Sequence, residues 1–277
     1  MPRPWNRHEN DSATMVAPDA RPRGYPLEME SPVPSDRLVV ALDGPGSSGK
    51  SSVGAAAALQ LGYRFCDTGL LYRAVTWLAL RRAVSATDGE GLRSLVTEVE
   101  LAPDEAGRLS RVLVDEVDHT SDVRSAAVDA AVSTVSALPT LRAALLDRQR
   151  VLASGGGIIM AGRDIGTVVL PDADLKIYLD ASVEERARRR TAERGFRPEG
   201  PEATAILEAL RQRDELDTTR AVAPLRIAAD ARIISTDRNR FEDTVDAVVG
   251  AIRDTGARRA DADARRTDTW STGAGKR

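Results

Sequence analysis

The sequence is poor in the residues that build disulfides and metal centres. It has one cysteine, Cys66, and two histidines, His8 and His119, among 277 residues. A single cysteine cannot form an internal disulfide, and so few thiol and imidazole ligands nearly exclude a His/Cys metal site. We therefore expect a protein of a reducing, intracellular compartment, which places it in the cytoplasm.

Long apolar runs and a surplus of positive charge are also missing. No stretch approaches the roughly 18 consecutive apolar residues that span a bilayer, which excludes an integral membrane protein. The 39 basic and 42 acidic side chains leave a net charge of −3, which argues against a main role in coating nucleic acid. With 42% hydrophobic and 29% charged residues, the composition is typical of a globular protein with a sizeable core.

The two ends of the chain lack apolar periodicity. Residues 1–36 hold seven of the fourteen prolines and predict a disordered arm. Residues 254–277 are rich in Ala, Asp, Arg and Thr, which predicts a disordered, solvated tail. The folded domain is therefore expected over residues 37–253.

Between these ends, short apolar runs alternate with helical patterns. Strands are predicted over 38–42, 63–66, 158–160, 175–179 and 231–234, and a hairpin over 99–114. Helices are predicted over 49–61, 69–83, 123–137, 140–152, 182–194, 201–216 and 240–253. This alternation favours an α/β fold, with a parallel sheet covered by helices on both faces.

The strongest motif is a phosphate-binding loop of the form G-x-x-x-x-G-K-[ST], placed between a predicted strand and a predicted helix. Its glycines let backbone N–H groups turn inward, and the helix N-terminus adds positive potential for an anion. Lys50 is expected to reach the β- and γ-phosphates of ATP, and the Ser51 hydroxyl to bind Mg²⁺. The residues expected to bind ATP are Gly44, Pro45, Gly46, Ser47, Ser48, Gly49, Lys50, Ser51 and Ser52.

Polar residues that could bind a second phosphate follow two of the predicted strands. Thr68 precedes a predicted helix and Arg73 lies about one turn into it, so both could face one cleft. Arg163 and Asp164 follow the strand at 158–160. Ligands of open parallel sheets bind outside the carboxyl ends of the strands, which favours a functional role for this pair. Arginine forks recognise phosphate oxygens in a bidentate manner.

Two later helices carry charged stripes. Arg213, Asp217 and Arg220 recur at i, i+4 and i+7, a spacing that fits a salt-bridge ladder and a substrate-binding face equally well. Arg186, Arg190 and Arg194 recur at i, i+4 and i+8 on the preceding helix. Stacked like charges are unfavourable, and a polyphosphate would relieve them, although a solvated helix face remains an alternative.

Taken together, these motifs resemble the cytidylate kinase family of nucleoside monophosphate kinases, over about residues 38–253. The most discriminating runs are Gly-Arg-Asp-Ile-Gly-Thr-Val-Val at 162–169 and Arg-Ala-Val-Ala-Pro-Leu at 220–225. Residues 43–45, 67–73 and 178–182 add to the match. Thr68 stands where the family commonly has serine, which keeps the hydroxyl.

The resemblance implies a fold and an activity. The expected fold is α/β, a P-loop parallel sheet core with an arginine-rich lid at about 182–200. A monophosphate-binding insert at about 85–150 is expected to contain a small antiparallel sheet. The expected reaction is ATP-dependent phosphorylation of CMP, with dCMP as a second acceptor and Mg²⁺ required. We expect a monomer that binds ATP and CMP or dCMP, with no nucleic acid or membrane partner.

The resemblance also assigns residues. Those implied to surround CMP are Thr68, Arg73, Ser133, Arg142, Arg163, Asp164, Arg213, Asp217 and Arg220. Lys50, Arg163, Arg186 and Arg190 are implied to act in phosphoryl transfer. Asp164 is expected to accept from the cytosine N4 amino group, with Arg142 and Ser133 donating to N3 and O2.

Two other functions stay open at this point. A kinase of another small acceptor, such as shikimate or another nucleoside monophosphate, would also carry the phosphate loop. A nucleotide-binding switch without a second substrate belongs to a different class. A GTPase is disfavoured because the dipeptide Asn-Lys of the guanine-reading motif is absent.

Overall fold

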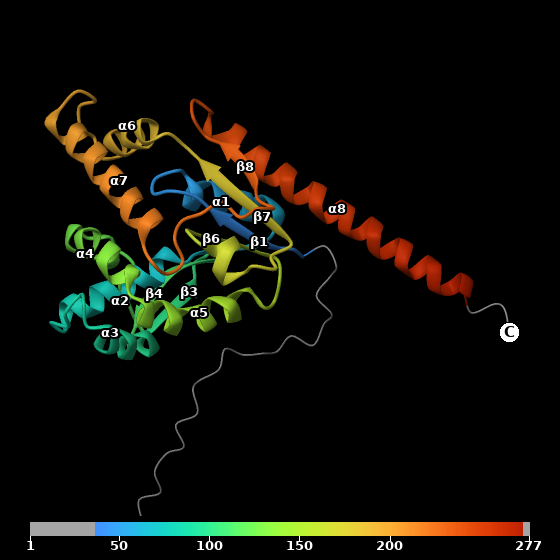
Figure 1. Cartoon of the computed structure of the whole chain (residues 1–277), viewed down its shortest axis with the longest axis horizontal. Helices are drawn as coiled ribbons and strands as arrows, with labels where there is room; N and C mark the ends of the chain where they lie inside the picture. The colour runs from blue at the N-terminus through green and yellow to red at the C-terminus, as the bar shows by residue number, and fades with distance from the viewer. Residues whose placement is uncertain (1–36, 274–277) are drawn as a thin grey trace, which may run out of the picture. The chain divides into compact units, whose positions relative to one another are not determined.

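The computed structural model describes residues 37–273, so the predicted arm at 1–36 lies outside the described residues. Within them, a single mixed sheet of eight strands forms the centre of the fold (Figure 1). The strands are β1 (Val39–Asp43), β2 (Arg64–Asp67), β3 (Val99–Pro103), β4 (Arg108–Val114), β5 (Val117–Asp118), β6 (Ile158–Gly162), β7 (Leu175–Asp180) and β8 (Arg232–Ser235). The helices are α1 (Lys50–Leu61), α2 (Gly69–Arg81), α3 (Gly89–Leu95), α4 (Ala126–Ala137), α5 (Pro139–Ala153), α6 (Val183–Glu193), α7 (Pro201–Thr219) and α8 (Phe241–Gly273).

The strand order is β3-β4-β2-β6-β1-β7-β8, with β5 paired to β4. Every neighbouring pair from β4 to β8 is parallel, and only β3 and β5 run antiparallel to β4. Strand β1 lies between β6 and β7; its connection through α1 runs to β2 on one side, whereas the connection from β6 crosses to β7 on the other side. Such a switch point opens a crevice at the carboxyl ends of the strands, where α/β proteins bind ligands.

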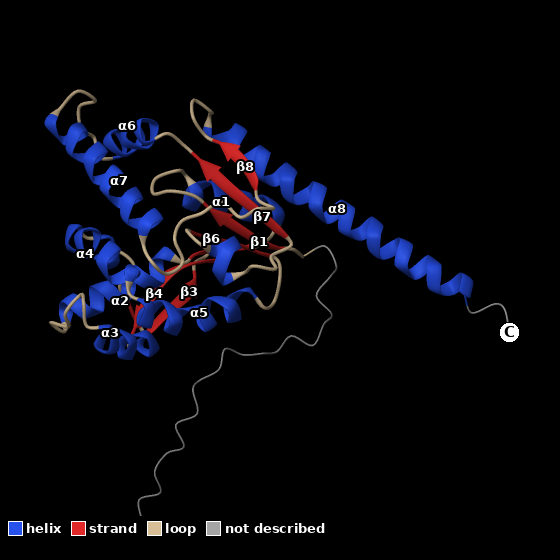
Figure 2. Ribbon diagram, in the orientation of Figure 1, coloured by secondary structure: helices blue, strands red, loops and turns tan. Residues whose placement is uncertain are grey.

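Alternating residues of the buried strands pack into two separate cores. Met160 on β6 joins the core formed with α2, α3, α4 and α5. Its neighbour Ile159 joins the core formed with α1 and α8 on the other face. The predicted α/β fold with helices on both faces is therefore confirmed (Figure 2). Helices α6 and α7 share a small cluster of their own, centred on Ala187, Ile206 and Leu210.

The predicted insert differs from expectation in how it joins the sheet. The hairpin of β3 and β4 forms, but β4 also pairs in parallel with β2. The antiparallel strands therefore extend the central sheet and are not a separate small sheet. Helix α3 was not predicted; its signal is Asp88, whose carboxylate accepts from the Gly91 N–H at 2.9 Å and caps the helix.

The predicted tail is also different, because α8 continues to Gly273 and does not end near residue 253. This segment lacks an apolar face, but alanine and arginine favour helix, and Asp and Arg alternate along it. Arg259 forms an ion pair with Asp174, next to the start of β7. Helix propensity and this ion pair thus extend the helix where apolar periodicity is absent.

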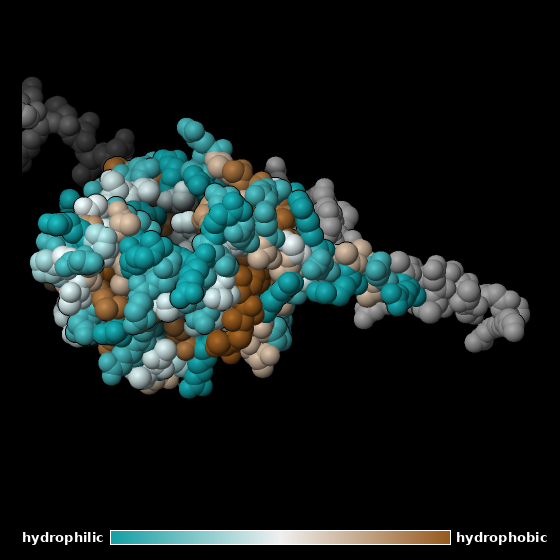
Figure 3. Space-filling model, turned by 90° about the horizontal axis from the view of Figure 1, so that it is seen from above, coloured by the Kyte–Doolittle hydropathy of each residue, from teal (hydrophilic) through white to brown (hydrophobic). Residues whose placement is uncertain are grey.

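The face of the molecule seen in Figure 3 is mostly hydrophilic, with hydrophobic residues gathered in a few patches. Across residues 37–273, none of the helices has the length and apolar composition that crossing a membrane requires.

Two helical glycines provide a matched test of how tightly the sheet and helices pack. A Cβ on Gly54 of α1 would lie 2.5 Å from the Phe65 ring and 2.9 Å from a Leu42 methyl group, whereas one on Gly250 of α8 meets nothing within 4 Å. Alanine gains about 1 kcal/mol of helix propensity at either position. We expect Gly250→Ala to raise the free energy of unfolding by about 0.5–1 kcal/mol. Gly54→Ala should lower it by about 1–3 kcal/mol through overpacking.

Urea denaturation of both variants measures this difference. Equal stabilisation by the two substitutions would show that the Phe65 and Leu42 side chains can shift to make room without lowering the free energy of unfolding.

Candidate active site

The carboxyl ends of three adjacent parallel strands surround one cavity. The phosphate loop follows β1, Asp67 and Thr68 stand at the end of β2, and Arg163 follows β6. The cavity between them has a volume of about 270 Å³. The predicted residues that line it are Gly46, Ser47, Gly49, Lys50, Ser51, Ser52, Thr68, Arg73, Arg142, Arg163, Asp164, Arg190, Arg213, Asp217 and Arg220.

The phosphate loop owes its curvature to glycine. Gly44 has a φ of +152°, and a Cβ there would lie 2.3 Å from the Leu179 carbonyl oxygen, so no side chain fits. Gly49 has a φ of +93° and leads directly into α1. Lys50 Nζ donates to the Pro45 carbonyl oxygen at 2.6 Å and lies 3.4 Å from Ser48 Oγ. The loop thus wraps around its own lysine at a helix N-terminus, a geometry suited to phosphate.

Lys50 is buried, and two opposing influences set its charge. Burial and the neighbouring Arg163 guanidinium lower the pKa of Lys50 well below its ordinary value, while Asp67 and Asp43 act in the opposite direction. Burial deprives the Lys50 ammonium of hydrating water. A bound polyphosphate would stabilise the charged form, because its negative charge would compensate for that loss.

Asp43 joins β1 to the turn that carries Arg163 and Asp164. Its carboxylate accepts the backbone N–H groups of Ile165 at 2.8 Å and Gly166 at 2.7 Å. Burial raises the pKa of Asp43 to about 6, although these N–H groups and Lys50 favour the charged form. Asp43 therefore fixes the position of the turn at the end of β6.

Ser51 and Asp67 form a polar pair in the lining of the cavity. Ser51 Oγ donates to Asp67 Oδ2 at 2.6 Å, and Asp67 Oδ1 accepts the Gly69 N–H at 3.0 Å. Both residues line the cavity. A hydroxyl and a carboxylate oxygen are the kinds of ligand that Mg²⁺ takes beside substrate phosphates.

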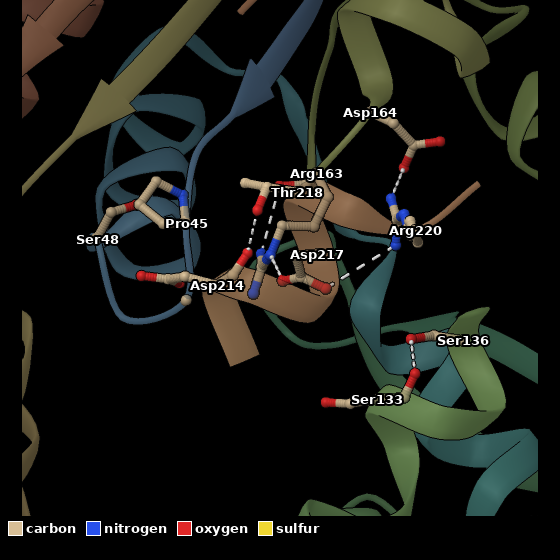
Figure 4. Close-up of polar contacts among 12 residues, drawn as sticks. Pro45, Ser48, Ser133, Ser136, Arg163, Asp164, Asp214, Asp217, Thr218 and Arg220 are labelled. Carbon is tan, nitrogen blue, oxygen red and sulfur yellow. Dashed lines mark hydrogen bonds and ion pairs between the residues drawn. The ribbon is translucent and has the colours of Figure 1, made fainter. Parts of the chain in front are cut away.

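On the other side of the cavity, arginines and carboxylates alternate. Arg163 Nε donates to Asp217 Oδ2 at 2.9 Å, and Arg220 lies 3.9 Å from the other oxygen of Asp217 and 3.4 Å from Asp164. Asp164 also pairs with Arg142. Figure 4 shows Asp217 between Arg163 and Arg220, with Arg220 reaching on to Asp164. The i, i+4, i+7 stripe thus faces the cavity, and its ion-pair partners Arg163 and Asp164 come from the turn after β6.

Arg213 is the cation of this group with the weakest compensation. Burial and the Arg163 guanidinium lower the pKa of Arg213 to about 10, against the opposing influence of Asp217. Its Nε and the Nε of Arg142 are two of the three buried side-chain polar atoms within residues 37–273 that lack a hydrogen-bond partner. Unpartnered buried donors facing a cavity are suited to an anionic or hydrogen-bonding ligand.

Helix α6 brings further arginines to the cavity. Arg190 lines it and approaches Ser47 Oγ at 3.4 Å. Arg186 is buried below, where it donates to the Gly46 carbonyl oxygen at 3.0 Å and pairs with Asp214 of α7. The predicted stripe is therefore neutralised partly by carboxylates of the protein itself.

The family model described as "Cytidylate kinase" matches residues 40–254. The chain belongs to the cytidylate kinase family. A cytidylate kinase of Pelotomaculum thermopropionicum is 46% identical over 215 residues, covering 77% of this chain and 95% of the relative. One of Symbiobacterium thermophilum is 45% identical over 224 residues, covering 79% and 97%. The resemblance inferred from the motifs is confirmed.

Five residues predicted from the sequence do not line the cavity. Gly44, Pro45 and Ser48 were predicted from the phosphate-loop motif, and Ser133 and Arg186 from the family resemblance. Gly44, Pro45 and Ser48 shape the loop from behind. Ser136, one turn after Ser133 on α4, lines the cavity, and its hydroxyl donates to the Ser133 carbonyl oxygen at 3.1 Å. Direct roles for Ser133 and Arg186 stay predictions.

Several residues of this cytidylate kinase site were not assigned from the sequence. Asp67 precedes Thr68 inside a family motif, and its place at the end of a strand is a usable signal. Asp43 immediately precedes the phosphate-loop motif at the end of β1. Ser136 and Asp214 carry no local signal, because only the packing of α4 and α7 brings them to the site.

The raised pKa of Asp43 predicts a pH-dependent stability. The folded protein keeps this proton up to about pH 6, whereas the ordinary pKa is 3.8, so the unfolded chain releases it earlier. The contribution of Asp43 to stability is therefore present below about pH 4 and is lost as the pH rises to about 6. Asp43→Asn removes this titration. We expect the stability of the wild type relative to the variant to fall by up to about 3 kcal/mol between pH 4 and 7.

Denaturation curves of the two proteins at several pH values measure this difference. A difference that does not change with pH would contradict the burial of an ionisable Asp43.

Proposed function

We propose that this protein transfers the γ-phosphoryl group of ATP to CMP, giving ADP and CDP, with dCMP as a second acceptor. The observation that carries the proposal is that the phosphate loop and the chain of arginines and carboxylates line the same cavity. Donor and acceptor can then meet in one cavity. Membership of the cytidylate kinase family supports cytidine monophosphate as the acceptor.

The phosphate loop would hold the donor. Its N–H groups and the α1 N-terminus supply positive potential, and Lys50 bridges the β- and γ-phosphates. Lys50 is already buried beside the loop carbonyls, so little reorganisation is needed when ATP arrives. Positioning and charge stabilisation account for most of phosphoryl-transfer catalysis, and no general base is required.

The acceptor would bind on the arginine side. Arg73, Arg163 and Arg213 would hold the CMP phosphate, because all three line the cavity, and Arg163 and Arg213 also lie close to the loop that carries the donor. Gly46 illustrates this proximity: a Cβ there would lie 3.4 Å from Arg163 Nη2 and 3.7 Å from Arg213 Cδ. Asp217, Arg220 and Thr68 would face the nucleoside.

The cytosine base would meet Asp164 and Arg142. Asp164 is almost fully buried, and each of its oxygens already faces one arginine. A carboxylate oxygen has a second lone pair, which can accept from the cytosine N4 amino group. Arg142 has an unpartnered Nε that can donate to the base.

Helices α6 and α7 would act as a lid. Arg190 approaches the phosphate loop through Ser47, and Arg186 is anchored below it. Closure would bring these guanidiniums toward the charge that develops on the transferred group and would exclude water.

Mg²⁺ fits the polar pair of Ser51 and Asp67 in the cavity lining. The Ser51 hydroxyl would bind it directly, and Asp67, which holds that hydroxyl at 2.6 Å, would orient the ligand set. When bound, the metal neutralises charge on the β- and γ-phosphates. We further propose that the enzyme works as a cytoplasmic monomer without nucleic-acid or membrane partners.

A coupled assay of ADP release with CMP, dCMP, UMP, AMP and shikimate tests the proposal. Acceleration by CMP and dCMP above the other acceptors supports it. A preference for shikimate or AMP would identify a different small-molecule kinase. Slow ATP hydrolysis that no acceptor changes would identify a nucleotide-binding switch.

Lys50 and Lys176 form a matched pair for testing the donor site. Lys176 lies outside the cavity and pairs with exposed Asp230 at 3.0 Å. We expect Lys50→Met to lower CMP phosphorylation by well over tenfold, a loss above about 1.4 kcal/mol of transition-state stabilisation, because the charge meeting the β- and γ-phosphates is gone. Lys176→Met should keep nearly all activity. Steady-state rates of CMP phosphorylation by both variants test this prediction. If Lys50→Met kept more than about a tenth of the wild-type rate, Lys50 would not be the residue that binds the ATP phosphates.

Asp164 should set the choice of base. Uracil presents a carbonyl oxygen where cytosine has its amino group, so a buried carboxylate meets a lone pair at a cost of about 1–3 kcal/mol. We expect Asp164→Asn to lower kcat/KM for CMP sharply and to narrow the CMP/UMP ratio, since an amide can present a donor or an acceptor. Kinetics with both nucleotides provide the measurement. An equal proportional loss for CMP and UMP would show that Asp164 does not read the base.

A further inference from the structure

One carboxylate, Asp129 on α4, links the lid to the acceptor side of the cavity. Its Oδ1 accepts from Arg73 Nη2 of α2 at 2.6 Å. Its Oδ2 lies 3.3 Å from the Nη2 atoms of both Arg190 and Arg194, at the end of α6. The side chain is about one-quarter exposed. Each oxygen thus serves one wall of the cleft.

Asp129 is behind the arginines that it holds. Arg73 and Arg190 line the cavity, whereas Asp129 and Arg194 are not among its described lining residues. Arg73 is fixed from behind a second time, since its Nη1 donates to the Val123 carbonyl oxygen at 3.2 Å. A carboxylate that competed with the acceptor phosphate would itself line the cavity. Its position favours a role in orienting Arg73 and Arg190.

The other ion pairs of α6 stay within the lid. Glu185 of the same helix holds Arg188 at 2.8 Å and Arg189 at 2.9 Å. Arg186 pairs with Asp214 of α7. Within residues 37–273, Asp129 is thus the carboxylate that pairs with arginines at the end of α6 from across the cleft.

We propose that Asp129 is a positioning residue that latches the lid onto α4 and holds Arg73 and Arg190 toward the cavity. The proposal rests on the kinase activity and lid role proposed above. Closure brings two cationic side chains together over the acceptor phosphate, and their mutual repulsion opposes it. The carboxylate behind them offsets that repulsion and leaves their cavity-facing donors available to phosphate.

The test is the kinetics of Asp129→Asn with ATP and CMP. We expect kcat to fall about fivefold to tenfold with a much smaller change in KM for ATP, because the lid closes less often over bound substrates. The variant should also lose the salt dependence of kcat, since added salt screens a partly exposed ion pair of the wild type. Asp129→Glu, which restores the charge, should recover most of kcat.

Arg194 and Arg188 provide the matched controls. Arg194 does not line the cavity and pairs with Asp129, so Arg194→Gln should lower kcat, and the double variant with Asp129→Asn should be no slower than Asp129→Asn alone. Arg188→Gln removes a lid arginine whose partner lies on its own helix, and it should behave as the wild type. Melting temperatures of the same cycle, without substrate, should show the same non-additivity.

Wild-type kcat and salt dependence in Asp129→Asn would overturn the proposal, as would additive effects of Asp129→Asn and Arg194→Gln in both readouts. A lower KM for CMP with unchanged kcat would make Asp129 a competitor of the phosphate and would also overturn it. Failure of the wild type to phosphorylate CMP would instead refute the proposed function, and the melting-temperature cycle would still decide the latch.

Discussion

The concentration of positive charge around one cavity is the constraint on which the rest of the site depends. A buried lysine and several guanidiniums converge there, and like charges in a space of reduced dielectric repel strongly. Carboxylates behind them offset this repulsion, as Asp217 does for Arg163 and Asp164 does for Arg142. The compensation is incomplete at Lys50 and Arg213, where burial and the neighbouring Arg163 guanidinium lower the pKa despite nearby carboxylates. Phosphate groups carry negative charge, so binding of the nucleotides would neutralise the positive charge that the protein's own carboxylates do not balance.

The sheet makes this concentration possible. Parallel strands end at one edge, and β1, β2 and β6 are adjacent there, so three loops distant in sequence share one space. Asp43 then ties the turn after β6 to β1 through two backbone hydrogen bonds. The arginine and carboxylate of that turn are thereby placed on rigid elements, as a site with exact geometric needs requires. Helices α6 and α7 pack on each other through a small apolar cluster of their own, separate from the two cores of the sheet.

How much of this could be predicted from the sequence depends on the range of the interactions. The phosphate loop was predictable because its strand, glycines and helix are contiguous, and the stripe at Arg213, Asp217 and Arg220 because it follows helical spacing. The spacing could not choose between a salt-bridge ladder and a binding face, since that choice depends on Arg163 and Asp164 from elsewhere. The pairing of β4 with β2 and the extension of α8 were missed for a similar reason. The pairing of β4 with β2 joins strands that are distant in the sequence, so no local pattern predicts it. The end of α8 lacks an apolar face, so hydrophobic periodicity misses a helix that residue propensity favours.

The same reasoning explains why Asp129 carries no sequence signal although it contacts three arginines. Asp129 lies on α4, whose sequence pattern is set by its valines, and no neighbouring residue forms a recognisable motif with it. Its meaning comes from α2 and α6, which reach it from opposite walls of the cleft. Motif residues supply the groups that touch phosphate, but their orientation is set by carboxylates outside any motif. Because those carboxylates hold the guanidiniums before substrates arrive, most of the ordering is complete on folding, and less remains to oppose the transfer step.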